Sequence, residues 1–110
     1  MAINPLDVSI EVRHYEIMAI QSFKRSDTEN LFKGESVKKF VNIQSIAMRK
    51  LAMLNRAATL NDLRVPPGNH LEALSGNRQG QHSIRVNNQW RVCFVWSEQG
   101  PTQVEIVDYH

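Results

Sequence analysis

The chain has 110 residues, of which 42% are hydrophobic, and its formal net charge is +2. This is enough chain for one domain, and no run approaches the ~18 apolar residues that span a bilayer, so no membrane association is expected. Cys93 is the single cysteine, which excludes an internal disulfide. The N-terminus also lacks the pattern of a secretion signal, so we expect the protein to be located in the cytoplasm.

Residues 1–17 show no clear periodicity, and they carry a formal charge of −2 against +4 for the remainder. We interpret them as an N-terminal extension without a catalytic role, followed by one domain over residues 18–110. Two origins stay open: an upstream segment that packs on the domain, or a misplaced start with Met18 as the natural first residue. The mildly basic domain is compatible with a nucleic-acid partner, as are many ordinary proteins.

Two helices are predicted after a first strand over about residues 19–24. Ser26 or Asp27 can cap a short helix that runs to about residue 33, where Gly34 suits the stop. A longer helix follows, because apolar residues recur at spacings of three and four; they are Ile43, Ala47, Leu51, Leu54 and Ala58. Arg49 and Arg56 project together from another side of this helix, either as a solvated face or as a binding surface.

Strands dominate the second half, where the periodicity changes to two. We expect a short helical turn at residues 61–64 and strands over residues 70–74, 81–86, 90–96 and 102–107. Residues 75–80 form a turn, Asn87-Asn88 a tight hairpin because Asn tolerates positive φ, and residues 98–101 the last turn. Helices followed by an antiparallel meander predict an α+β domain with both helices on one sheet face.

In the 90–96 strand, alternation places Trp90, Val92, Phe94 and Trp96 on one face, and Arg91, Cys93 and Val95 on the other. Arg85, and by the same alternation Tyr109, lie on the Arg91 face. A half-buried arginine needs a carboxylate or a phosphate, so a bridge from Arg91 to Glu105 and binding of a ligand are both open. Metal-ligand spacings and a phosphate-binding glycine loop are absent, and no cofactor is expected.

Three segments together resemble the HigB branch of the RelE/ParE toxin superfamily, most closely its GraT-like members: residues 69–86, 89–94 and 104–110. The resemblance covers about residues 18–110 and ends on Asp108-Tyr109-His110. It implies a RelE-like fold and a metal-free, ribosome-dependent endoribonuclease that cleaves the mRNA codon in the A site. It also implies a HigA-type helix-turn-helix antitoxin, whose complex with the toxin binds operator DNA and represses the operon.

The resemblance also implies roles for individual residues. Asp108, Tyr109 and His110 match the catalytic terminal triplet, and Arg78 and Arg91 match basic positions around the scissile phosphate. Glu72 and Ser75 depart from the family, which has a histidine and a lysine there. These two changes make the site less basic and leave the strength of toxicity open.

Metal-free cleavage of RNA by the neighbouring 2′-hydroxyl needs a base, an acid and positive charge on the phosphorane. We assign proton transfer to His110 and Glu72, charge stabilisation to Arg78 and Arg91, and binding or stacking of a base to Tyr109, while Asp108 orients its neighbours. The RNA- and ribosome-binding residues are expected to be Lys38, Lys39, Arg49, Arg56 and Arg85.

Two rival functions remain open at this point. ParE-like toxins of the same fold inhibit DNA gyrase without cutting RNA. A degenerate toxin would act only through antitoxin binding and operon autoregulation. The retained ending Asp108-Tyr109-His110 favours the nuclease.

Overall fold

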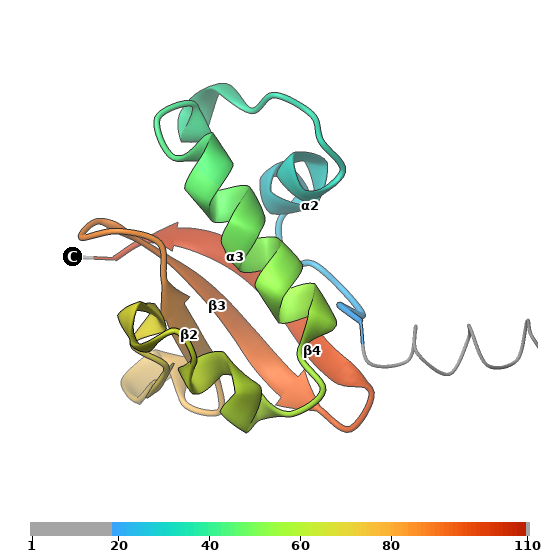
Figure 1. Cartoon of the computed structure of the whole chain (residues 1–110), viewed down its shortest axis with the longest axis vertical. Coiled ribbons are helices and arrows are strands. Elements are labelled where there is room, and N and C mark those ends of the chain that lie inside the picture. Colours follow the sequence, from blue (N-terminus) through green and yellow to red (C-terminus); the bar gives the residue numbers. More distant parts are fainter. Residues whose placement is uncertain (1–18, 110) are drawn as a thin grey trace, which may run out of the picture.

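The computed structural model describes residues 19–109, and within them two α-helices pack on one four-stranded sheet (Figure 1). The helices are α2 (Ser26–Phe32) and α3 (Gln44–Arg56). The strands are β1 (Glu72–Ala73), β2 (His82–Arg85), β3 (Trp90–Ser97) and β4 (Gly100–Asp108), paired antiparallel in the order β1-β2-β3-β4. The predicted α+β class is confirmed, and no described helix has the length and apolar character needed to cross a membrane.

The segment ahead of α2 is extended but does not form the regular strand predicted at residues 19–24. It touches the outer edge of β4 through one parallel bridge between Phe23 and Val104. The amide of Lys24 donates to the Val104 carbonyl at 2.9 Å, and the chain then turns into α2. The pairing stays short because the chain leaves the sheet at once to begin the helix.

Helix α2 begins without the predicted cap. Its N-cap residue is Arg25, in an extended conformation and without a side-chain cap bond, while Ser26 and Asp27 lie inside the first turn. The Asp27 carboxylate instead accepts hydrogen bonds from Lys39 at 3.0 Å and Arg25 at 3.3 Å. The predicted stop is confirmed, because Gly34 has φ +95°, which costs a residue without Cβ little.

Asp27 is expected to make stability depend on acid pH. Burial raises the pKa of Asp27, but hydrogen bonds from Lys39, Thr28 and Arg25 outweigh it and hold the pKa below its ordinary value. A carboxyl with a depressed folded-state pKa stabilises the fold above its unfolded pKa, and that contribution disappears as pH falls through the folded pKa. Asp27→Asn should therefore destabilise the protein at pH 7, and this deficit should begin to shrink below about pH 4 and shrink further as pH falls through the depressed folded-state pKa.

Urea unfolding at several pH values checks this expectation. Glu29→Gln is the matched control, since Glu29 lies on the same helix and forms an ion pair with the exposed Lys33 at 3.3 Å. An Asp27→Asn deficit that stays constant from pH 7 to pH 3 contradicts the assignment.

Helix α3 supplies the predicted apolar stripe, with one error at its end. Ala47, Leu51 and Leu54 are fully buried, and Ile43 is 5% exposed. Ala58 is exposed, because the helix ends at Arg56 and the extended backbone of Ala57 puts that residue into the core instead. Arg49 and Arg56 are both exposed, as expected.

The hairpin between β2 and β3 differs from the prediction. Neither Asn87 nor Asn88 has positive φ. Instead the side-chain oxygen of Asn87 accepts hydrogen bonds from the amides of Gln89 and Trp90, both at 2.8 Å, so a side chain closes the turn in place of a left-handed backbone. The strand predicted at residues 70–74 is reduced to β1, because His70 adopts a left-handed conformation with φ 45°.

The two faces of the sheet are separated as alternation predicted. The hydrophobic core lies between the sheet and α3, and Val92, Phe94 and Val104 are fully buried there. The opposite face buries polar groups as well, with Ser83 at 0% and Glu105 at 4% exposure. This polar face carries the arginines singled out from the sequence.

Candidate active site

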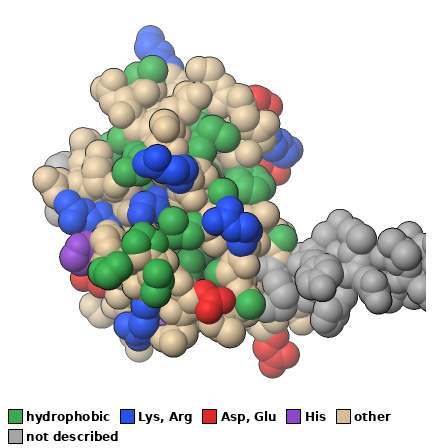
Figure 2. Space-filling model, viewed as in Figure 1, with side chains coloured by type: hydrophobic (Ala, Val, Ile, Leu, Met, Phe, Trp, Pro, Cys, Tyr) green, Lys and Arg blue, Asp and Glu red, His purple; other side chains and the backbone are tan. Residues whose placement is uncertain are grey.

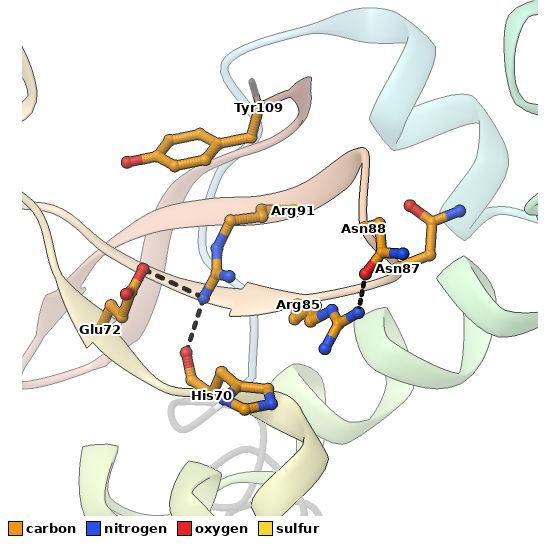
Figure 3. Close-up of a pocket in the computed structure, with 7 residues that line it drawn as sticks. All are labelled: His70, Glu72, Arg85, Asn87, Asn88, Arg91 and Tyr109. Carbon is orange, nitrogen blue, oxygen red and sulfur yellow. Dashed lines mark hydrogen bonds and ion pairs between the residues drawn. The ribbon is translucent and has the colours of Figure 1, made fainter.

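A concavity of about 260 Å³ opens on the polar face, where the ends of β2, β3 and β4 meet the segment before β1 (Figure 3). Alternation places Arg85, Arg91 and Tyr109 on this face, and the chain around residues 70–72 closes the remaining side. Its lining residues are His70, Glu72, Arg85, Asn87, Asn88, Arg91 and Tyr109. Glu72, Arg85, Arg91 and Tyr109 were predicted site residues, and the fold brings them together.

Arg91 is the most firmly held of these side chains, at 12% exposure. Its Nε donates to the Ser83 hydroxyl at 2.7 Å, and its Nη2 donates to the His70 carbonyl at 2.6 Å. The same Nη2 lies 3.4 Å from the Glu72 carboxylate, which is 54% exposed (Figure 3). A guanidinium fixed on two uncharged acceptors and one solvated carboxylate keeps much of its charge available to a ligand.

The open alternative of an Arg91–Glu105 bridge is wrong. Glu105 lies 3.1 Å from Nη1 of Arg78 and 3.6 Å from Nζ of Lys24. Register explains this, because Glu105 is paired with Cys93 on β3, two residues along from Arg91.

Arg85, on the neighbouring strand β2, adds a second positive charge to the same face of the sheet. It is the cross-strand partner of Arg91, and its guanidinium donates to the side-chain oxygen of Asn88. Like charges directly opposite each other on neighbouring strands destabilise a sheet unless something neutralises them. Glu72 is the only acidic side chain that lines this concavity among the described residues, so the site retains excess positive charge suited to an anion.

Tyr109 covers the guanidinium of Arg91 from the end of β4. Its amide donates to the Gln89 carbonyl at 2.6 Å, which fixes the chain there, and its ring centroid lies 5.7 Å from Cζ of Arg91. Cation–π attraction stabilises this arrangement. At 39% exposure the ring also keeps a free surface on which a planar group can stack.

The other predicted catalytic residues lie elsewhere or outside the described chain. Asp108 accepts a hydrogen bond from the Gln89 side chain at 3.0 Å and, with Arg78, lines a neighbouring hollow of about 270 Å³. The hydrogen bond to Glu105 raises the pKa of Arg78, so its charge is already engaged. His110 lies outside the described residues.

Sequence patterns missed three contributors to the site. Ser83 alternates with Arg85 on the same face, and that signal was available. Asn88 and the His70 carbonyl were not recognisable, because one depends on the turn geometry and the other on a left-handed backbone.

Burial raises the pKa of Cys93 to about 11, so this thiol is not an activated nucleophile. Between residues 19 and 109 no three His, Cys, Asp or Glu side chains gather in a metal-binding group.

The chain that forms this α+β fold matches, over residues 21–110, the family model described as the RelE-like toxin of the type II toxin–antitoxin system HigB. The chain therefore belongs to the HigB-like toxins, and the resemblance read from its sequence is confirmed. Membership in a type II system implies an antitoxin partner.

Two relatives show how far the similarity extends. Toxin HigB-1 of Vibrio cholerae is 40% identical over 81 residues, which cover 72% of this chain and 84% of that toxin. An uncharacterized protein of Haemophilus influenzae is 43% identical over 55 residues, or 50% of this chain and 54% of the relative.

Proposed function

We propose that this toxin is a ribosome-dependent endoribonuclease that cleaves mRNA codons in the A site. The observation that carries the proposal is the pair of guanidinium groups of Arg85 and Arg91, opposite each other on neighbouring strands and beside the exposed ring of Tyr109. Guanidinium groups match the geometry of a phosphate, and an aromatic ring stacks on an unpaired base. A single-stranded RNA presents a phosphate and an unpaired base one nucleotide apart.

The groups in the concavity support cleavage by the neighbouring 2′-hydroxyl. The 2′-hydroxyl attacks the adjacent phosphorus, the bond to the 5′-oxygen breaks, and a 2′,3′-cyclic phosphate and a 5′-hydroxyl result. Arg91 would stabilise the charge that develops on the phosphorane, and it is already fixed by Ser83 and the His70 carbonyl, so little reorganisation is needed during reaction.

Proton transfer needs two further groups near the same phosphate. The carboxylate of Glu72 lines the concavity and is exposed enough to take up the hydroxyl proton. With Glu72 as the base, His110, which the family resemblance places in the catalytic triplet, would donate the proton to the leaving 5′-oxygen. His70 also lines the concavity, where its carbonyl accepts from Arg91. Asp108, bonded to Gln89, would orient the end of the chain.

Docking on the ribosome is assigned to the exposed cations of α3 and the turn before it. Arg49, Arg56, Lys38 and Lys39 are all exposed. Figure 2 shows Lys and Arg side chains spread over the face that carries α3, with hydrophobic side chains between them. Such cations bind RNA phosphates in a salt-dependent manner without reading sequence.

Charge reversal on α3 tests this surface. The double variant Arg49→Glu and Arg56→Glu should weaken co-sedimentation with ribosomes, and the salt dependence of binding should become shallower, because each lost phosphate contact lowers the slope by about 0.7 to 0.9. Arg64→Glu is the matched control, since Arg64 is exposed outside α3 and donates to Asn61. Unchanged sedimentation of the double variant would leave these arginines as a solubilising surface only.

The proposal extends to partners and location. A HigA-type antitoxin with a helix-turn-helix domain would neutralise the toxin in the cytoplasm. Operator DNA would be contacted only through the toxin–antitoxin complex.

The decisive test is to induce the chain without its antitoxin and map the 5′ ends of cellular transcripts. The expected result is growth arrest with new ends inside translated codons, and their loss when translation is blocked at initiation. Uncut transcripts with a DNA-damage response would indicate gyrase inhibition instead. Normal growth alongside normal antitoxin binding would indicate a toxin that acts only in regulation.

A further inference from the structure

Asn69 is a fully buried polar residue at the end of a short 3₁₀ turn (Pro67–Asn69), next to the candidate site. Its amide nitrogen donates to the Leu63 carbonyl at 3.1 Å and approaches the Val65 carbonyl at 3.5 Å. Its oxygen accepts from Nζ of Lys50, on α3, at 2.5 Å. Both ends of the amide are therefore occupied, which locks the side chain and the backbone that carries it.

The residue that follows has a strained backbone. His70 adopts φ 45° and ψ 58°, a left-handed conformation that is uncommon for a residue other than glycine. This conformation turns the His70 carbonyl toward Arg91, whose Nη2 donates to it at 2.6 Å (Figure 3). Strain of this kind persists only where the surrounding contacts hold it, and the bonds of Asn69 are such contacts.

From these contacts we infer that Asn69 is a positioning residue for RNA cleavage: it holds the His70 carbonyl in place, and the carbonyl holds the Arg91 guanidinium at the scissile phosphate. The inference rests on the proposed function, because it gives Arg91 a catalytic task. Lys50 belongs to the same chain of contacts and connects it to α3. Ser83 fixes Nε of Arg91 and the His70 carbonyl fixes Nη2, so both hydrogen bonds are needed to set the plane of the guanidinium.

A double-mutant cycle separates positioning from ordinary structural support. The variants are Asn69→Ala, Arg91→Ala and the two combined, each assayed for single-turnover cleavage of mRNA on programmed, saturating ribosomes. Asn69→Ala alone is expected to slow cleavage about 10- to 100-fold, the scale expected of a misplacement near 1 Å. In the Arg91→Ala background the same change should have almost no further effect, because the group that it positions is gone.

A second measurement does not depend on activity. The Nη–H resonances of Arg91 in a ¹⁵N spectrum should be protected from exchange in the parent protein, because Nη2 donates to the His70 carbonyl, and lose that protection in Asn69→Ala. Asn55→Ala is the matched control, because Asn55 is also an asparagine bonded to backbone, at 3.0 Å from the Ile20 amide. It should change neither the cleavage rate nor the Arg91 resonance.

Folding is checked by thermal melting of each variant. If Asn69→Ala is unfolded, Asn69→Asp and Lys50→Met take its place: the first removes the bonds from the amide nitrogen to the loop carbonyls and to Met53, and the second removes only the bond from Lys50. Both should slow cleavage and expose the Arg91 resonance. Multiplicative losses in the cycle, or an unchanged resonance, overturn the inference while leaving the nuclease intact. Full cleavage by Arg91→Ala overturns the catalytic assignment as well.

Discussion

Replacing Arg91 with alanine is expected to reduce single-turnover cleavage of mRNA on programmed ribosomes by about 10²- to 10³-fold, the usual cost of removing one preorganised donor to a developing oxyanion. The guanidinium is held by Ser83 and the His70 carbonyl and lies under Tyr109. Its removal takes away the best-fixed positive charge in the concavity. Growth arrest on induction should weaken in parallel.

Arg91→Lys is the informative companion variant. Lysine keeps the charge but cannot make the planar set of bonds to Ser83 and His70, so we expect a loss nearly as large as that of alanine. The fold should survive both changes, since the carboxylate left behind, that of Glu72, is exposed to water. Cleavage at the parental rate by a folded Arg91→Ala protein would remove Arg91 from the mechanism.

Phe94→Ala should have the largest effect on stability. The ring is fully buried between the sheet and the helices and stacks on His82 at a centroid distance of 6.3 Å. Emptying such a site costs about 3–5 kcal/mol. A domain of this size has about 5–15 kcal/mol in total, so a large share of the margin would be lost. The melting temperature should fall by roughly 12 °C or more.

Phe94→Leu provides the comparison, because leucine refills part of the cavity and should cost clearly less. Both variants are measured by urea unfolding with a common slope. Phe94 lies on the face of β3 opposite Arg91, so the cleavage rate of the folded fraction should change little. A loss of unfolding free energy below about 1 kcal/mol for Phe94→Ala would mean that the core collapses into the space that the ring leaves.

Local pattern predicted most of the secondary structure. The repeat of apolar residues on α3 and the alternation on β3 depend only on neighbours a few positions away, so the sequence places Leu51 in the core and Arg91 on the opposite face. Errors fell at the ends of elements. The α2 cap, the burial of Ala58 and the Asn87-Asn88 turn all depend on one or two backbone angles that periodicity does not determine.

The sequence by itself determined the class of protein, because the segments that carry the family resemblance are read without knowing where they meet. It also determined that Arg85, Arg91 and Tyr109 share one face of the sheet. Only the tertiary structure decided which groups hold these residues. Glu72 and His70 contact Arg91 although they lie about twenty positions away in the sequence, and Glu105 forms its ion pair with Arg78. Strand register and loop path bring these groups together, and no local sequence pattern links them.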